Sequence, residues 1–220
     1  RDSVASRGLG DVYKRQGKSW YAYGTSMTSE SWGTFVPIVA EFSGLNVTNK
    51  GIPAGSLTPD GLGKGNIKRA VMNLDDGKAE ADLITLEVLP NEGAVVGNLY
   101  DTDDVSFCGC FNQAIRYLQA NTKAQIVVIV MIGSNTAPPQ GKCAGRKISE
   151  FEFAETIERL ARMNGVPVIN AFCDSGFGYG RVKARDYQKD NIHLNDLGGL
   201  NMAKFIWSKL KDIPTWEAPK

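Results

Sequence analysis

The chain has few histidines and cysteines, and it lacks the common phosphate-binding loops. It contains one histidine, His193, and four cysteines among 220 residues. Because the chain has only one histidine and no CxxC pair, no zinc or other metal site is expected. The sequence also lacks GxxxxGK[ST] after a strand and GxGxxG at a helix start, which argues against the common nucleotide-binding loops.

Neither one sign of charge nor long hydrophobic runs dominate the chain. Lys and Arg number 25 against 24 Asp and Glu, a net charge of +1. This balance gives no electrostatic basis for binding nucleic acid or an anionic membrane. The longest apolar run, near Ile126–Ile132, is too short for a membrane span. The composition fits one globular domain and leaves its compartment and oligomeric state open.

The ends of the chain differ from its middle. Residues Arg1–Gln16 have neither apolar periodicity nor the hydrophobic core of a signal peptide. They are typical of a leader fragment foreign to the domain, so we expect one domain over residues 17–214 and a tail at 215–220. If so, the true N-terminus is missing, and cytoplasmic and secreted locations both stay open.

The cysteines are compatible with two states. Cys108 and Cys110 are too close in sequence to form an ordinary disulfide with each other. A single bridge from this pair to Cys143 or Cys173 fits a secreted protein. Free thiols are the alternative, because unpaired cysteine is often buried.

From Gly17 onward, short β-rich runs alternate with helical patterns. The middle runs are almost continuously apolar, as in strands buried on both faces of a parallel sheet. We therefore expect an α/β domain with a doubly wound parallel sheet. The expected strands are Ser19–Tyr23, Asn46–Asn49, Asp82–Val88, Gln125–Ile132 and Pro167–Phe172, and the expected helices are Phe35–Phe42, Asn66–Leu74, Phe111–Asn121, Ser149–Met163 and Asp196–Lys211.

Polar residues at the carboxyl ends of the strands are the first site candidates, because ligands of open α/β sheets bind there. Ser26 follows the first expected strand and Gly24. Its hydroxyl is placed to act as a nucleophile, with its own N–H directed at an oxyanion. A serine that caps a turn is the structural alternative.

The segment Asp190–Asp196 carries the strongest local pattern, because it holds the only histidine. A carboxylate three residues before His193 can fold back and accept from the imidazole Nδ1–H, which leaves Nε2 free as a general base. The structural alternative is a surface histidine beside a helix capped by Asn195 or Asp196.

Two weaker candidates complete the set. Asn91, after the third expected strand, offers a neutral side-chain donor, and Gly55, after the second, lets the backbone approach a ligand. A Pro-Asn turn and an ordinary loop glycine are the structural alternatives. All four segments fall where one edge of the sheet can assemble them.

In this order the segments resemble the SGNH hydrolases, also called the GDSL family of esterases and lipases, over about Ser19–Leu210. The matching positions are Gly24-Thr25-Ser26 for the nucleophile block, Gly55 for the backbone donor, Asn91 for the third block and Asp190–His193 for the final DxxH. The resemblance implies a three-layer α/β/α sandwich with a flavodoxin-like parallel sheet.

The chain departs from the family pattern at several positions. Thr25 replaces the usual Asp before the serine, Leu89 the Gly before Asn91, and Glu92 the Asp after it. Because Pro53-Ala54 precedes Gly55, Gly51 is an alternative backbone donor.

The resemblance implies a carboxylic ester hydrolase that works through an acyl-enzyme and requires no metal or organic cofactor. Ser26 is the expected nucleophile, His193 the base and Asp190 the acid, with the oxyanion bound by Ser26, Gly55 and Asn91. The expected substrate is a small-molecule or glycan ester of a short acyl group such as acetyl. An acyltransferase with the same triad and a non-catalytic flavodoxin-like binding module are the alternatives.

Substrate-contacting residues are harder to predict. The loop Gly176–Gly180 carries aromatic residues that can line an acyl or sugar pocket. The tryptophans lie too far apart in the sequence to indicate a sugar platform: they are Trp20, Trp32, Trp207 and Trp216.

Overall fold

The computed structural model describes residues 15–59, 65–89, 95–133, 148–177, 186–190 and 192–215. Its centre is a five-stranded parallel sheet in the order β2-β1-β5-β6-β7. This is a doubly wound order, whose switch point lies between β1 and β5. The strands are β1 (Ser19–Gly24), β2 (Asn46–Gly51), β5 (Leu83–Val88), β6 (Gln125–Val130) and β7 (Val168–Asn170), and a separate pair joins β3 (Gly55–Ser56) to β4 (Gly65–Asn66).

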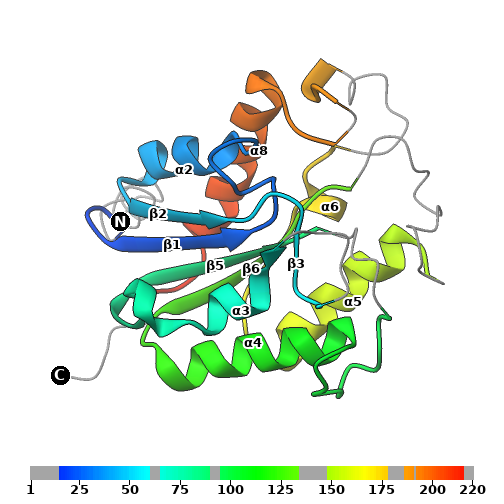
Figure 1. The fold of residues 1–220 in the computed structure, drawn as a ribbon. Helices are drawn as coiled ribbons and strands as arrows, with labels where there is room; N and C mark the ends of the chain where they lie inside the picture. Colours follow the sequence, from blue (N-terminus) through cyan, green and yellow to red (C-terminus); the bar gives the residue numbers. More distant parts are fainter. Residues whose placement is uncertain are drawn as a thin grey trace, which may run out of the picture.

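Helices cover both faces of the sheet, so the expected three-layer α/β/α architecture is confirmed (Figure 1). One face carries α2 (Phe35–Ser43) and α8 (Asp196–Leu210). The other carries α3 (Ile67–Met72), α4 (Phe107–Asn121) and α5 (Glu150–Met163). The shorter elements are η1 (Leu74–Asp76), η2 (Lys78–Glu80) and α6 (Ala171–Asp174).

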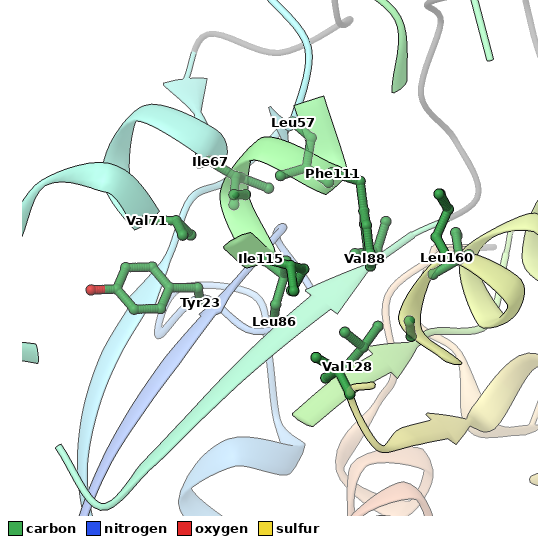
Figure 2. Packing of buried hydrophobic residues seen from close by; sticks show 14 of the residues in the cluster. Tyr23, Leu57, Ile67, Val71, Leu86, Val88, Phe111, Ile115, Val128 and Leu160 are labelled. Atoms are coloured by element: carbon green, nitrogen blue, oxygen red, sulfur yellow. The ribbon is translucent and has the colours of Figure 1, made fainter. Parts of the chain in front are cut away.

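The side chains of the central strands alternate between two hydrophobic cores, because successive residues of a strand point to opposite faces. Leu86 and Val88 of β5 and Val128 of β6 belong to the core under α3, α4 and α5, together with Phe111 and Leu160 (Figure 2). The intervening apolar residues, Leu83, Val127 and Ile129, belong to the core under α2 and α8. Burial on both faces explains the almost continuous apolar runs in the sequence.

Side-chain caps decide where several elements begin. Helix α5 begins with a capping box, whose two members are Ser149 and Glu152. Helix α4 begins at Phe107, four residues before its expected start, because the Ser106 hydroxyl accepts from the N–H of Gly109 at 3.1 Å. The last strand ends at Asn170, short of the expected Phe172, where the Asn170 side chain caps α6.

Two cysteines, Cys108 and Cys110, lie buried on α4, and Cys173 is exposed. Cys108 and Cys173 are thiols, and burial raises the pKa of Cys108 to about 11. Cys143 lies outside the described residues, so the alternative of a bridge to it stays a prediction. Among the described helices none is both long and apolar enough to cross a membrane.

Arg15 belongs to the packed domain although it falls within the expected leader. Its guanidinium is buried and donates to the carbonyls of Leu210 at 3.1 Å and Ile213 at 2.9 Å, at the end of α8. It also donates to Gln125 Oε1 at 3.1 Å. The packed part of the chain thus begins at Arg15 at the latest, two residues before the expected boundary at residue 17. Residues 1–14 lie outside the described part.

A buried carboxylate joins β5 to the turn that follows β1. Glu87 is 1 % exposed, and its Oε2 accepts from the Thr25 N–H at 2.7 Å, the Thr25 hydroxyl at 2.9 Å and the Thr28 hydroxyl at 3.0 Å. Burial raises the pKa of Glu87 to about 7, although these hydrogen bonds act in the opposite direction. The turn is therefore attached to the centre of the sheet through one side chain.

Replacing Arg15 with alanine should destabilise the fold by about 1–3 kcal/mol, because the carbonyls at the end of α8 lose a charged, buried donor. The free energy of unfolding in urea measures this effect. Lys18→Ala is the matched control, since its ion pair with Asp82 is exposed and such pairs contribute less than about 1 kcal/mol. Equal losses in the two variants would contradict a structural role of Arg15.

Glu87 should make stability fall as the pH rises. Its folded pKa of about 7 lies above the ordinary value of 4.5, so the folded protein holds a proton that the unfolded chain releases between these values. The free energy of unfolding should therefore decrease from pH 4.5 to pH 7, by on the order of 3 kcal/mol for this group, and then level off. Glu87→Gln should flatten the profile, and identical wild-type and variant slopes would show that Glu87 is ionised throughout.

Candidate active site

The turn after β1 exposes Ser26 at the carboxyl edge of the sheet. Its backbone closes through the Thr25 carbonyl, which accepts from the N–H groups of Thr28 at 3.2 Å and Ser29 at 3.1 Å. Ser26 is the first residue within this helix-like turn. The first N–H groups of a helical turn have no acceptor inside the turn. Among the residues described, none accepts from the Ser26 N–H. The hydrogen-bonded backbone of this turn therefore positions both the hydroxyl and the N–H of Ser26.

Two strand-end glycines allow this turn to sit close to the sheet. A Cβ at Gly24 would overlap the carboxylate of Glu87 and the hydroxyl of Thr28. A Cβ at Gly51, at the end of β2, would overlap the backbone of Ser29. Close approach of backbone to neighbouring groups is the reason that glycine is required here, and neither position has a positive φ.

Asp190 and His193 form a compact unit within four residues of sequence. Asp190 Oδ1 accepts from the backbone N–H groups of Ile192 at 3.2 Å and His193 at 2.7 Å. Its second oxygen, Oδ2, lies 2.6 Å from His193 Nδ1. A carboxylate requires a donor, so Nδ1 carries the proton and Nε2 is left unprotonated in the neutral ring.

The structure brings this unit to Ser26. His193 Nε2 lies 2.8 Å from Ser26 Oγ, which can donate its hydroxyl proton to the ring. The side chains of Ser26, His193 and Asp190 therefore form a continuous chain of hydrogen bonds, although Ser26 and His193 lie 167 positions apart in the sequence. Asn195 caps α8 by accepting from the Gly198 N–H at 2.9 Å, so capping and the histidine contact occur together.

Asp190 is held in its ionised form. Partial burial raises its pKa, but the backbone and side-chain hydrogen bonds from His193 outweigh burial, and the net pKa lies below the ordinary value. An ionised Asp190 can stabilise the positive charge that forms on His193 when its ring takes up a proton.

The glycines expected as backbone donors to the oxyanion already have hydrogen-bond partners in the structure. The Gly55 N–H donates to the Ile52 carbonyl at 2.9 Å, and the Gly51 N–H donates to Asn49 Oδ1 at 2.9 Å, so both are engaged. Ala54 lies between Pro53 and Gly55 in this turn with a φ of 53°, a conformation that non-glycine residues rarely adopt. Its N–H has no hydrogen-bond partner within the described part of the chain. Asn91 lies outside the described residues.

Three residues next to this chain of hydrogen bonds were not among those predicted from the sequence. Trp32 packs its indole against the His193 ring, and Lys189 lies over the indole. Glu87 holds the turn from below. A charged residue within the apolar run of β5 was the one available signal for Glu87. Trp32 and Lys189 gave none, because their contacts join distant segments. No metal-binding cluster of three His, Cys, Asp or Glu side chains occurs in the described ranges.

Neither a protein-family model nor a curated protein sequence matches this chain. Solved structures do match over most of its length. A protein from Lactobacillus plantarum aligns with a TM-score of 0.73 at 19% identity, covering 90% of this chain and 98% of its own.

Two further structures that are similar to this chain carry described activities. A catalytic mutant of an acetylxylan esterase from Geobacillus stearothermophilus has a TM-score of 0.61 at 12% identity, covering 93% of this chain and 98% of its own. A carbohydrate acetylesterase from Sinorhizobium meliloti has a TM-score of 0.60 at 13% identity, covering 88% of this chain and 98% of its own. At these identities the likeness concerns the fold alone, and this chain shares the three-layer α/β/α fold of these structures.

Proposed function

We propose that this protein is a serine esterase that cleaves carboxylic esters of short acyl groups, such as acetyl, on carbohydrates or small alcohols. The observation that carries the proposal is the chain of hydrogen bonds from Ser26 Oγ to His193 Nε2 and from His193 Nδ1 to Asp190, at 2.8 Å and 2.6 Å. A nucleophile, a base and an orienting acid within hydrogen-bond reach are the arrangement that acyl transfer requires.

In the first half of the reaction Ser26 Oγ attacks the ester carbonyl carbon while His193 Nε2 takes the hydroxyl proton. The tetrahedral intermediate collapses, the bond between the carbonyl carbon and the alcohol oxygen breaks, and Nε2–H gives its proton to the leaving alcohol. The acyl group remains on Ser26. Asp190 keeps the ring in the required tautomer and stabilises the imidazolium between these steps.

In the second half a water molecule takes the place of the alcohol. His193 Nε2 removes a proton from the water as its oxygen attacks the acyl carbon, and the proton then returns to Ser26 Oγ as the acid leaves. Each step uses side chains of this chain alone, so the reaction requires no redox cofactor.

The oxyanion requires donors that are free to face it. Ser26 supplies its N–H, which has no acceptor among the described residues, and Asn91 remains the expected side-chain donor. In the turn after β2 the Gly55 N–H would have to leave the Ile52 carbonyl to contribute. We therefore assign the backbone donor of this turn to Ala54. Its φ of 53° lies in the left-handed region, and non-glycine residues in this strained conformation are concentrated at functional sites.

The fold neighbours support the choice of substrate. Two of them are described as an acetylxylan esterase and a carbohydrate acetylesterase. An acyltransferase would use the same first half-reaction and pass the acyl group to a sugar hydroxyl. A flavodoxin-like binding module would give Ser26 and His193 no shared role, which disfavours it given their contact.

Ser26→Ala and His193→Ala should each lower kcat for p-nitrophenyl acetate by at least about 10³-fold, because the nucleophile or its base is removed. Asp190→Asn should lower kcat less than Ser26→Ala, since it changes the tautomer preference of the ring and keeps the nucleophile. Initial rates and unfolding midpoints of all three variants check this prediction.

A fluorophosphonate probe supplies the control for this experiment. It should label Ser26 in the wild type and leave Ser26→Ala unlabelled, with the modified peptide identified by mass spectrometry. Wild-type rates in folded Ser26→Ala, or labelling of another serine, would refute the proposed function. Transfer of acetyl to added xylose faster than to water would favour the acyltransferase.

A further inference from the structure

Trp32 places a large aromatic surface beside the candidate base. The centroids of its ring and the His193 ring are 4.7 Å apart, with an interplanar angle of 32°. Trp32 nevertheless remains 43% exposed, among the largest exposures of an aromatic residue in the described part of the chain. Leaving so much apolar surface in water is unfavourable, so a ligand that covers the indole would gain free energy.

The backbone fixes Trp32 to the turn that carries Ser26. The N–H of Gly33 donates to the Ser29 carbonyl at 2.7 Å, and a Cβ at Gly33 would overlap the Met27 carbonyl. The Ser29 hydroxyl in turn donates to the Ser26 carbonyl at 3.1 Å. Trp32 and Ser26 therefore keep a constant relative position, as a binding surface beside a nucleophile requires.

Lys189 adds hydrogen-bond donors at the same place. Its Nζ lies 5.3 Å from the centroid of the Trp32 ring and donates to the Trp32 carbonyl at 3.3 Å. No carboxylate forms a salt bridge with this ammonium within the part of the chain that the structure describes. A lysine has three N–H donors, so at least one remains for a ligand oxygen.

The direction of the reaction determines which half of the ester meets these residues. The acyl group stays on Ser26, whereas the alcohol oxygen must receive its proton from His193 Nε2. The alcohol half therefore leaves past the imidazole, and the indole of Trp32 packs against that imidazole.

We propose that Trp32 and Lys189 form the binding site for the alcohol half of the substrate, and that this half is a sugar ring. The inference rests on the proposed function, and it specifies the substrate class of that site. A pyranose ring has a C–H face that packs on an indole, and hydroxyl oxygens at its edge that accept from an ammonium. A simple aliphatic alcohol would cover the indole but would offer no ring hydroxyl oxygens to the N–H donors of Lys189 that do not reach the Trp32 carbonyl.

The test compares two acetyl esters in the same variants. Trp32→Ala and Lys189→Ala should lower kcat/KM for an acetylated xylooligosaccharide more than kcat/KM for methyl acetate. The ratio of the two values should fall roughly tenfold or more in Trp32→Ala, mainly through KM, because the variant loses the surface that the sugar covers. An unchanged ratio in both variants would overturn the proposal.

The chain offers a matched control pair at the far end of α8. Lys209 Nζ lies 5.7 Å from the centroid of the Phe205 ring, so it forms the same type of cation–π contact. Phe205 and Lys209 have no place in the proposed site. Phe205→Ala and Lys209→Ala should therefore leave the ratio between the two esters as it is in the wild type. A fall in these variants that equals the fall in Trp32→Ala would attribute the effect to stability and overturn the proposal.

A binding measurement separates this inference from the proposed function. His193 is the only histidine of the chain, so its imidazole resonances in an untagged, isotope-labelled protein are unambiguous. In Ser26→Ala, the acetylated xylooligosaccharide should shift these resonances with saturation, and Trp32→Ala in the same background should raise the Kd roughly tenfold. Absence of a shift, or equal Kd values, would overturn the sugar site even in an active esterase. Saturable binding by a wild type that cleaves no ester would refute the esterase and leave the sugar site standing.

Discussion

The hydrogen bonds from Thr25 and Thr28 to the buried carboxylate of Glu87 are the contact on which the candidate site depends. They attach the turn after β1 to β5, the strand beside the switch point of the sheet. Because the same turn carries Ser26 and leads into Trp32, its position determines where both the nucleophile and the indole lie. A carboxylate is well suited to this task, since a single group can accept several hydrogen bonds at once.

The histidine side of the site is built in a different way. Asp190 binds the backbone and the ring of His193 through contacts that span only three residues, so this unit is determined by local sequence. Its placement depends on α8, which Asn195 caps directly after the histidine. Gly199 lies on this helix where a Cβ would overlap the Thr34 side chain just before α2, so the helix can approach the loop that follows the Ser26 turn. The 2.8 Å contact between the two halves thus depends on helix packing.

These two kinds of construction explain what the sequence could predict. The strands, the faces of the helices and the Asp190–His193 unit follow from periodicity and short spacing, which act within one segment. Ser26 could be named before its surroundings were known because it follows the first expected strand and Gly24, and ligands of open α/β sheets bind at the carboxyl ends of the strands. Trp32 and Lys189 were missed because their meeting depends on a contact between residues 157 positions apart. The surroundings of Gly55 could not be predicted for a related reason, since only the backbone reveals that its N–H donates to the Ile52 carbonyl.

Burying the Glu87 carboxyl lowers the stability of the fold, so its presence in β5 requires an explanation. Its raised pKa means that ionisation of this carboxyl lowers the free energy of unfolding. Thr25 stands where the resembling family has an aspartate next to the nucleophile, and its hydroxyl and N–H both reach Glu87. The carboxylate that holds this turn belongs to β5 and not to the turn itself. A carboxylate in the turn would be free to move with it, whereas one on a central strand cannot move without disturbing the sheet. The loss of stability is therefore coupled to a gain in the rigidity of the residues on either side of Ser26. This rigidity is required because the nucleophile must meet its base at hydrogen-bond distance.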